Sequence, residues 1–443
     1  MMTLGTIIFY FVLLCLVIKL LPFFKNSGIK VRFLWACFLL KFLVSFLMYY
    51  VYTYYYPNRI DADIFKFFDD SEIIYNSFFN STSDFKNLIF ETNIDTHYYV
   101  ENYLQHMNNW ERLYDNGVYN DNRILIKINA FFRFISFHQF HVHSLFFCFL
   151  SLTGLVALCR VLKKFIPNNS ILILLLFFLP SLLFWTSGIL KESLHVFALG
   201  LFLFSITNIL NHKTSGSSIV ILISSLLLIL YIKPFIFLAI APPLIGYGLA
   251  NYIKLKKWKI YLSILLFFAL FLFFSTSIVP SINLLEILKQ KQTNFILFSE
   301  FQEAGSQFHL TRMDNSIIGF LSVVPEGVLN CFIRPLPWEI NGFIEIPIVI
   351  ENSLIILFVF ILNWLVLKKH IVVKEDHKNF IWFSVVYILI LYSIIGVTTP
   401  VSGSLVRYKV SALPFLIFVL LYFFQNLSFV LTLEKKINRF VCA

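Results

Sequence analysis

The sequence predicts an all-α polytopic membrane protein, a bundle of about eleven transmembrane helices with two extracytoplasmic segments. Of the 443 residues 59% are apolar, 54 of them Phe, and only 13% are charged, whereas a soluble domain has ~25% charged residues. Apolar runs recur along the chain, with cations between them. This composition excludes a soluble globule, a disordered chain and a disulfide scaffold.

The predicted spans follow the apolar runs, because a helix needs ~20 apolar residues to cross a bilayer. These runs lie at 3–24, 33–56, 140–160, 170–190, 194–210, 218–233, 235–250, 260–279, 347–367, 380–397 and 410–431. Two of the pairs, 170–210 and 218–250, have short turns and short helices, which indicates tilted or broken hairpins. The first run has no signal-peptide cleavage pattern, so we expect a retained helix.

The distribution of charge orients the chain. The segments 25–32, 160–169, 211–217, 251–259 and 368–379, with the C-terminal tail, hold 18 of the 35 Lys and Arg residues and three of the 24 acids. Cytoplasmic loops of membrane proteins are rich in Lys and Arg. We therefore place these segments in the cytoplasm, with the N-terminus outside and the C-terminus inside.

This orientation divides the chain into five segments. They are N-terminal transmembrane helices (1–56), a first extracytoplasmic acidic loop (57–133), transmembrane helices (134–279), a second extracytoplasmic loop (280–346), and C-terminal transmembrane helices with a cytoplasmic tail (347–443). The first loop has 12 acids between Asp61 and Asp121. Both loops carry scattered aromatic residues, so we expect small ordered caps.

Some patterns give no signal for a ligand. The six cysteines form no CxxC pair, and His141 and His143 would point to different faces of a helix, which favours an interfacial cluster with His138 over a metal site. The net charge of +11 comes from cations between apolar runs. That pattern indicates a membrane protein in contact with the bilayer and predicts no nucleic-acid partner.

Four aspartates, Asp61, Asp63, Asp69 and Asp70, directly follow the second span. On a helix, Asp63 and Asp70 would share a face with Phe67. Aromatic residues would then hold the helix at the interface, with carboxylates above the membrane. Such a carboxylate acts as a general base on a sugar hydroxyl or holds a divalent metal. The alternative is a solvated acidic loop.

Lys191 and Glu192 lie in a tight outward turn after Ser187-Gly188, and Lys233-Pro234 forms another. Charges in such turns are costly unless they pair or work. Exposed backbone N–H groups beside Lys191 would suit a phosphate. The alternatives are an interface salt bridge at Lys191 and Glu192, and a snorkelling lysine before a helix-ending proline at Lys233.

Two further segments carry cations near span mouths. Arg334, Trp338 and Glu339 precede the ninth span, and Arg407, Tyr408 and Lys409 precede the last. Arginine suits bidentate phosphate capture, and tryptophan stacks on a sugar or sits in the aromatic belt. These residues either mark the interface or, with Lys191 and Lys233, form a ring of cations. A lipid diphosphate at the outer leaflet best explains such a ring.

Several of these motifs carry a resemblance to known proteins. An acidic outward loop after an early helix, a polytopic body and a late Arg407-Tyr408 at a span mouth resemble the GT-C superfamily of integral-membrane glycosyltransferases. The segments around Asp61–Asp70, Phe184–Glu192, Lys233-Pro234 and Arg334–Glu339 are similar to those of a bacterial polytopic group within it. In the superfamily the acidic loop normally follows the first helix, whereas here it follows the second run.

The resemblance implies a GT-C-like fold and a glycosyltransferase. The donor would be a polyprenyl-phosphate- or polyprenyl-diphosphate-linked sugar, and the acceptor an extracytoplasmic glycan, lipid or protein. Asp61 or Asp63 would activate the acceptor, sometimes with a divalent metal such as Mg²⁺ or Mn²⁺, and Asp69 and Asp70 would assist. The phosphate contacts would come from the cations Lys191, Lys233, Arg334 and Arg407.

We therefore expect an enzyme of the bacterial cytoplasmic membrane, with its active site facing outside, in cell-envelope polysaccharide or glycoconjugate synthesis. One rival is an O-antigen-type polymerase or ligase, which would depend on arginines instead of a carboxylate base. A second is a transporter or flippase of lipid-linked glycans, although the sequence shows no inverted repeat and no broken-helix pair in matching halves. A third is a non-catalytic subunit of an envelope complex.

Overall fold

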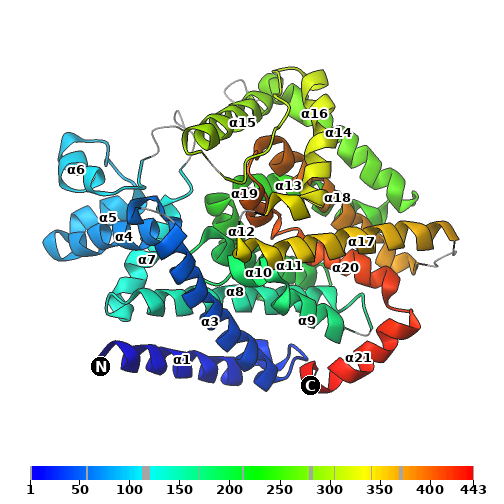
Figure 1. Ribbon diagram of the computed structural model, residues 1–443, viewed down its shortest axis with the longest axis horizontal. Coiled ribbons are helices and arrows are strands. Elements are labelled where there is room, and N and C mark those ends of the chain that lie inside the picture. Colours follow the sequence, from blue (N-terminus) through cyan, green and yellow to red (C-terminus); the bar gives the residue numbers. More distant parts are fainter. Residues whose placement is uncertain are drawn as a thin grey trace. The chain divides into compact units, whose positions relative to one another are not determined.

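The computed structural model describes residues 2–55, 58–111, 120–167, 169–211, 214–278, 283–303, 305–340, 342–368 and 373–442. Every regular element in these ranges is a helix, which confirms the all-α class (Figure 1). Six of the helices are long and apolar enough to cross a membrane, and a seventh candidate is a pair of helices bent by 68°. The chain is therefore a membrane protein by composition and by helix length.

The predicted count of about eleven spans is not confirmed. The six candidates lie at Val31–Tyr54, Phe140–Leu162, Lys191–Leu210, Pro234–Tyr252, Ile346–Trp364 and Glu375–Thr398. Other apolar helices are shorter: Leu4–Leu20, Gly216–Ile232 and Ile317–Ile333. The run predicted at 170–190 is divided, because Leu179 before Pro180 is extended, as residues before proline usually are.

The chain forms two compact units. The first consists of residues 1–161, 183–233 and 439–443, and the second of residues 162–182 and 234–438. The helices of the first unit are α1 (Met2–Leu20), α2 (Pro22–Lys25), α3 (Val31–Tyr55), α4 (Asp63–Asn80), α5 (Thr82–Phe90), α6 (His97–Asn102), α7 (Arg123–Ser136), α8 (Phe140–Leu162), α11 (Lys191–Leu210) and α12 (Gly216–Ile232), with the short 3-10 turns η1 (Arg59–Asp61) and η2 (Leu104–His106). Helix α10 (Pro180–Trp185) crosses the boundary between the units.

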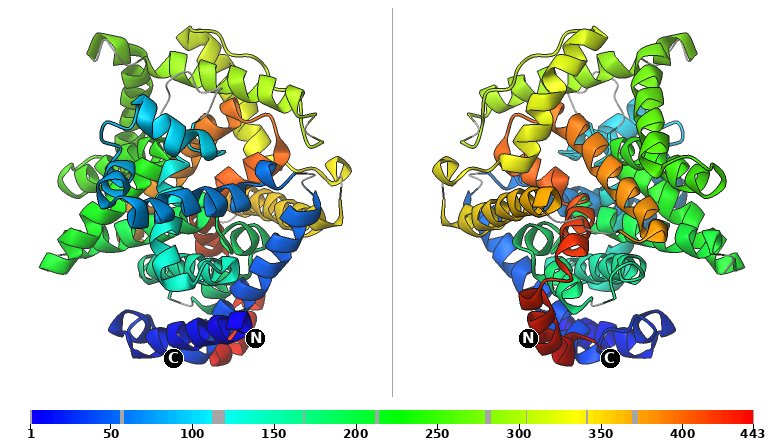
Figure 2. Two further views of the ribbon diagram at one scale, coloured as in Figure 1. Left: turned by 90° about the vertical axis from the view of Figure 1, so that its left-hand side faces the viewer. Right: turned by 90° about the vertical axis from the view of Figure 1, so that its right-hand side faces the viewer.

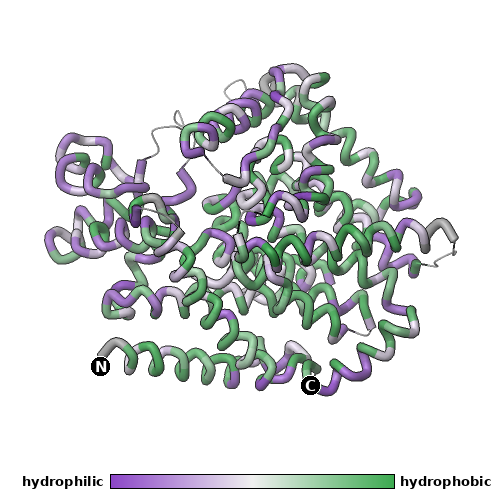
Figure 3. Tube along the Cα trace, viewed as in Figure 1, coloured by the Kyte–Doolittle hydropathy of each residue, from purple (hydrophilic) through white to green (hydrophobic). Residues whose placement is uncertain are grey.

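Helices α4 to α7 form an ordered cap on the polar part of the first unit, with α4 packed along α7 (Figure 2). This part is markedly more hydrophilic than α1 and α3 (Figure 3). Ser81 ends α4 and caps α5, because its hydroxyl accepts the N–H of Asp84 at 3.2 Å. The apolar face of α4, including Phe67 and Ile74, is buried in the cap core. The described residues of the predicted acidic segment are thus largely helical and contain buried residues.

The second unit contains α9 (Ser170–Phe178), α13 (Pro234–Tyr252), α14 (Lys257–Ile278), α15 (Leu284–Phe301), α16 (Ile317–Ile333), α17 (Ile346–Lys368), α18 (Glu375–Thr398), α19 (Ser402–Lys409), α20 (Leu413–Phe424) and most of α21 (Ser428–Val441), with η3 (Pro337–Glu339) and η4 (Phe343–Glu345). The second predicted outward segment, 280–346, is therefore largely helical. Its apolar helix α16 packs along α18. No bilayer is present, so the division into inside and outside segments stays a prediction.

Paired glycines allow two helix pairs to approach closely. A Cβ atom on Gly396 of α18 would lie 2.1 Å from the carbonyl oxygen of Gly327 on α16. In the first unit, a Cβ atom on Gly200 of α11 would lie 2.1 Å from the carbonyl oxygen of Gly154 on α8. Membrane helices commonly pack through such small residues, because hydrophobic burial does not drive their association in lipid.

We expect Gly396→Ala to destabilise the second unit by about 1–3 kcal/mol, the usual cost of overpacking. The added methyl group would meet backbone atoms, which have little freedom to move. Thermal unfolding of the purified protein in detergent, followed by circular dichroism, measures this effect. Gly248→Ala on α13 is the matched control, because nothing lies within 4 Å of its Cβ position. Equal unfolding temperatures for the two variants would contradict the close approach of α16 and α18 at Gly327 and Gly396.

Candidate functional site

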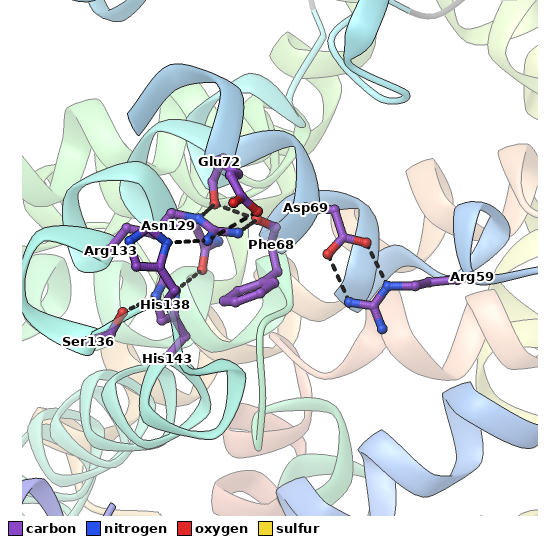
Figure 4. A network of polar contacts seen from close by, with 10 residues as sticks. Arg59, Phe68, Asp69, Glu72, Asn129, Arg133, Ser136, His138 and His143 are labelled. Atoms are coloured by element: carbon purple, nitrogen blue, oxygen red, sulfur yellow. Dashed lines mark hydrogen bonds and ion pairs between the residues drawn. The ribbon is translucent and has the colours of Figure 1, made fainter. Parts of the chain in front are cut away.

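Asp69 of the cap is engaged in an ion pair. Its two carboxylate oxygens accept from Nε and Nη2 of Arg59 at 2.7 and 2.8 Å (Figure 4). The Arg59 guanidinium also lies 4.0 Å from the centre of the Phe65 ring. The hydrogen bonds to Asp69 raise the pKa of Arg59. Asp69 thus helps to fix the turn that leads into α4, although both side chains stay partly exposed.

Asp70 holds a loop of the cap. Its side chain is buried, and its two oxygens accept the backbone N–H groups of Asn108 and Asn109 at 2.9 and 2.8 Å. Burial raises the pKa of Asp70 to about 6, and the two backbone hydrogen bonds oppose that shift. The predicted face shared by Asp63, Phe67 and Asp70 therefore turns toward the cap core at Phe67 and Asp70, not toward water.

Asp63 is the first residue of α4 and is half-buried. A carboxylate at this position is favoured by the positive end of the helix dipole. Asp61 ends the short 3-10 turn η1, and its side chain lies outside the described part. The membrane helix α3 ends at Tyr55, so both aspartates follow it within a short stretch of chain.

A buried arginine connects α4 with α7 (Figure 4). Arg133 donates from Nε to the Ser71 hydroxyl at 2.8 Å and from Nη2 to the Phe68 carbonyl at 2.6 Å. Its Nη1 lies 3.0 Å from Nδ1 of His138 and 3.5 Å from a carboxylate oxygen of Glu72. These contacts satisfy a guanidinium that is only 2% exposed.

His143 on α8 continues this polar network. Its two ring nitrogens lie 2.7 Å from Oδ1 of Asn129 and 2.7 Å from the hydroxyl of Ser136. Arg133 was not among the site residues predicted from the sequence. The sequence does contain a pattern that indicates a polar helix face, because Asn129, Arg133 and Ser136 are spaced four and three residues apart and so share one face of α7. His138 and His143 both have polar partners on α7, and the predicted interfacial cluster of the three histidines stays a prediction.

Two ion pairs lie at the start of α11. Nζ of Lys191 is 2.6 Å from Asp121 of the cap, and Nζ of Lys233 is 2.6 Å from Glu192. The second pair is almost fully buried, with side chains 4% and 2% exposed. His195, one turn further along α11, is also buried. The predicted neighbours Lys191 and Glu192 therefore each pair with a different segment of the chain.

In the second unit, Lys409 fastens the end of α16. Its ammonium group donates to the carbonyls of Cys331 and Arg334 at 3.2 and 2.9 Å and to Oδ1 of Asn352 at 2.9 Å. An ammonium group has three N–H donors. All three are occupied, so Lys409 would have to give up a structural contact before it could bind a phosphate.

Arg334 also has protein partners. Its guanidinium pairs with Glu339, donates to Oδ1 of Asn330 at 3.1 Å and lies 4.1 Å from the centre of the Phe308 ring. The side chain of Trp338, by contrast, is 79% exposed. Trp338 is thus placed to meet lipid or a ligand, whereas Arg334 and Glu339 fix the local backbone.

Arg407 and Tyr408 lie on the short helix α19, and both are half-buried. The Tyr408 ring packs edge-on to that of Phe235, with centres 6.2 Å apart. The five predicted cations thus fall into two groups: Lys191 and Lys233 in the first unit, and Arg334, Arg407 and Lys409 in the second. The single ring of cations therefore stays a prediction.

Among the described side chains, no group of three or more His, Cys, Asp or Glu residues is arranged to hold a metal ion. The Asp61 side chain is outside this set. A metal site at Asp61 and Asp63 therefore stays a prediction. The described geometry offers carboxylates for proton transfer and cations for an anionic group.

The raised pKa of Asp70 predicts how cap stability changes with pH. The folded pKa of about 6 lies above the unfolded value of about 4, so the folded cap binds this proton more tightly. The resulting stabilisation is complete below about pH 4 and is lost as the pH rises through about 6. Relative to Asp70→Asn, the native protein should lose up to about 3 kcal/mol between these pH values.

Hydrogen exchange of the cap peptides at several pH values, corrected for intrinsic exchange, measures this difference. Asp69→Asn is the control, because it removes a partly exposed ion pair worth at most about 1 kcal/mol. Parallel pH profiles for the native protein and Asp70→Asn would show that the Asp70 proton is not linked to folding of the cap.

Comparison of the chain with protein-family models, with curated proteins and with solved structures finds no match in any of the three.

Proposed function

We propose that the protein is an integral-membrane glycosyltransferase with a GT-C-like fold of about eleven spans. It transfers a sugar or glycan from a polyprenyl-phosphate or polyprenyl-diphosphate donor to an acceptor on the outer face of a bacterial cytoplasmic membrane. The observation that carries the proposal is the carboxylate-rich cap, whose first long helix begins with Asp63 shortly after the membrane helix α3. This position suits a base that works on an acceptor at the membrane surface.

Asp63 is the proposed general base. Asp63 is half-buried at a helix N-terminus, and Asp61 lies two residues before it, at the end of the short turn η1. The acceptor hydroxyl would attack the anomeric carbon while Asp63 takes its proton, and the donor phosphate would leave with the electron pair of the broken C–O bond.

The leaving phosphate needs positive charge to stabilise it. In the first unit we assign this role to Lys191, which is at the first position of the 20-residue helix α11. In the second unit we assign it to Arg334 and Arg407. We instead assign a structural role to Lys233 and Lys409. Lys233 pairs with a buried carboxylate, and the three donors of Lys409 are occupied.

Transport of a lipid-linked glycan is a second candidate function, favoured by one bent helix pair and one non-helical stretch beside a candidate span. The chain between α10 and α11 is not helical, and α19 and α20 meet at a bend of 68°. Discontinuous helices are common at the substrate sites of transporters. An assay of donor consumption in liposomes separates the two functions, because a transporter would move the donor between leaflets without a covalent product.

Asp63→Asn should lower donor consumption by about 10²–10⁴-fold, the usual contribution of a general base. The assay uses protein in liposomes with polyprenyl-linked sugars, with and without Mg²⁺ or Mn²⁺, and follows the donor by mass spectrometry. Asp69→Asn is the matched control and should keep most of its activity. Full activity of Asp63→Asn would favour an arginine-dependent polymerase or ligase.

Variants of Lys233 and Glu192 test whether Lys233 has a structural role or contacts the donor phosphate. Lys233→Met should destabilise the protein by about 3–5 kcal/mol, because it leaves a buried carboxylate without its partner. The double variant Glu192→Gln with Lys233→Met should recover most of both stability and donor consumption. Lys191→Met should stay inactive even when Asp121→Asn is added. A stable but inactive Glu192/Lys233 double variant would instead give Lys233 a direct phosphate contact.

A further inference from the structure

A non-helical stretch lies within the apolar part of the first unit. It comprises residues 186–190, between α10 and α11, and all five residues are buried. Gly188 has a φ of +154°, and a Cβ atom there would lie 2.8 Å from Sδ of Met48. Non-helical backbone at membrane depth is tolerated only where protein or internal water satisfies its polar groups.

Two contacts fix the depth of this stretch in the membrane helices. The Ser151 hydroxyl donates to the Thr186 carbonyl at 2.7 Å, and Ser151 is midway along α8 (Phe140–Leu162). At the other end, Leu190 packs with Met48 and Tyr52 near the end of α3. The stretch therefore runs from the middle of the span toward one membrane surface.

Lys41 of α3 lies against the deep end of this stretch. Its side chain is 1% exposed, and its Nζ lies 2.6 Å from the Thr186 hydroxyl. Among the described residues, no carboxylate lies within 4.0 Å of this amine. The titratable groups that face it are the thiols of Cys37, one turn earlier on α3, and Cys148 on α8. Lys41 is thus a buried basic group in the interior of a membrane helix bundle, with no carboxylate counter-ion among the described residues.

The energetics of this site depend on one proton. A buried ammonium group costs several kcal/mol unless it is paired. It also has three N–H donors, whereas the only hydrogen-bond acceptor that we identify among the described residues is the Thr186 hydroxyl. A neutral amine fits the same place with that single hydrogen bond. Protonation therefore creates a demand for water or further acceptors that the closed packing does not meet.

We propose that Lys41 is an intramembrane proton-binding site and that its protonation loosens the non-helical stretch 186–190. The proton comes from a hydronium ion: the lone pair of the Lys41 amine forms an N–H bond as one O–H bond of the hydronium breaks and leaves a water molecule. Water then reaches the ammonium group as the packing around Thr186 opens. The stretch leads directly into Lys191 and Glu192, so the proton would change the order of that helix start. This inference does not depend on the glycosyltransferase proposal.

Hydrogen exchange of the peptides that cover 183–193 tests the proposal in the full-length protein in nanodiscs. It is measured from mildly acidic to mildly alkaline pH in the native protein, in Lys41→Met and in Lys41→Arg. The ratio of native to Lys41→Met exchange rates cancels the intrinsic effect of pH. This ratio should be near one at alkaline pH. It should rise about tenfold for each unit by which the pH falls, over the range where Lys41 gains its proton.

Lys41→Arg stays charged throughout, so its segment should exchange fast at every pH. Lys19→Met, an exposed lysine on α1, is the control and should behave as the native protein. A ratio that does not change with pH, or slow exchange in Lys41→Arg, would overturn the proposal. If Lys41→Met fails to fold, ¹⁵N-lysine NMR of the native protein decides instead: the Lys41 Nζ signal must titrate together with the exchange of 183–193, and a signal that does not change with pH overturns the proposal.

Discussion

The structure depends on one constraint, that a charge buried among membrane helices has to be satisfied inside the bundle. Lipid offers no hydrogen bonds, and an unpaired buried charge costs several kcal/mol. The Glu192–Lys233 pair and the three acceptors around Lys409 both meet this requirement. Both lysines lie where a helix ends: Lys233 directly follows α12, and Lys409 is the last residue of α19.

The sequence predicted the class of structure because composition and apolar runs report directly on the bilayer. It also predicted that the acidic segment is an ordered cap. It did not predict which carboxylates hold the cap together, since Asp70 meets backbone N–H groups almost 40 residues away, at Asn108 and Asn109. No local pattern encodes such a contact. The count of about eleven spans is not confirmed for a related reason, because an apolar run such as 170–190 gives no measure of where its helix breaks.

The cationic residues illustrate the same limit for the candidate site. A lysine at a span mouth reads identically in the sequence whether it binds a ligand or a carbonyl. The contacts show that the three donors of Lys409 are occupied and that Lys191 pairs with Asp121 of the cap. The sequence thus identified where charge enters the apolar region, and the structure shows which of these charges already have a structural task.

The contacts of Asp69 and Asp70 within the cap also bear on how a carboxylate could act as a base. An acidic surface with many equivalent carboxylates would bind cations without selecting one group as a base. Here Asp69 and Asp70 are held by Arg59 and by backbone N–H groups. These contacts order the turn and helix on which Asp63 is placed. A base must be held within hydrogen-bond reach of its substrate to be effective, so the structural carboxylates are what would allow a neighbouring one to be catalytic.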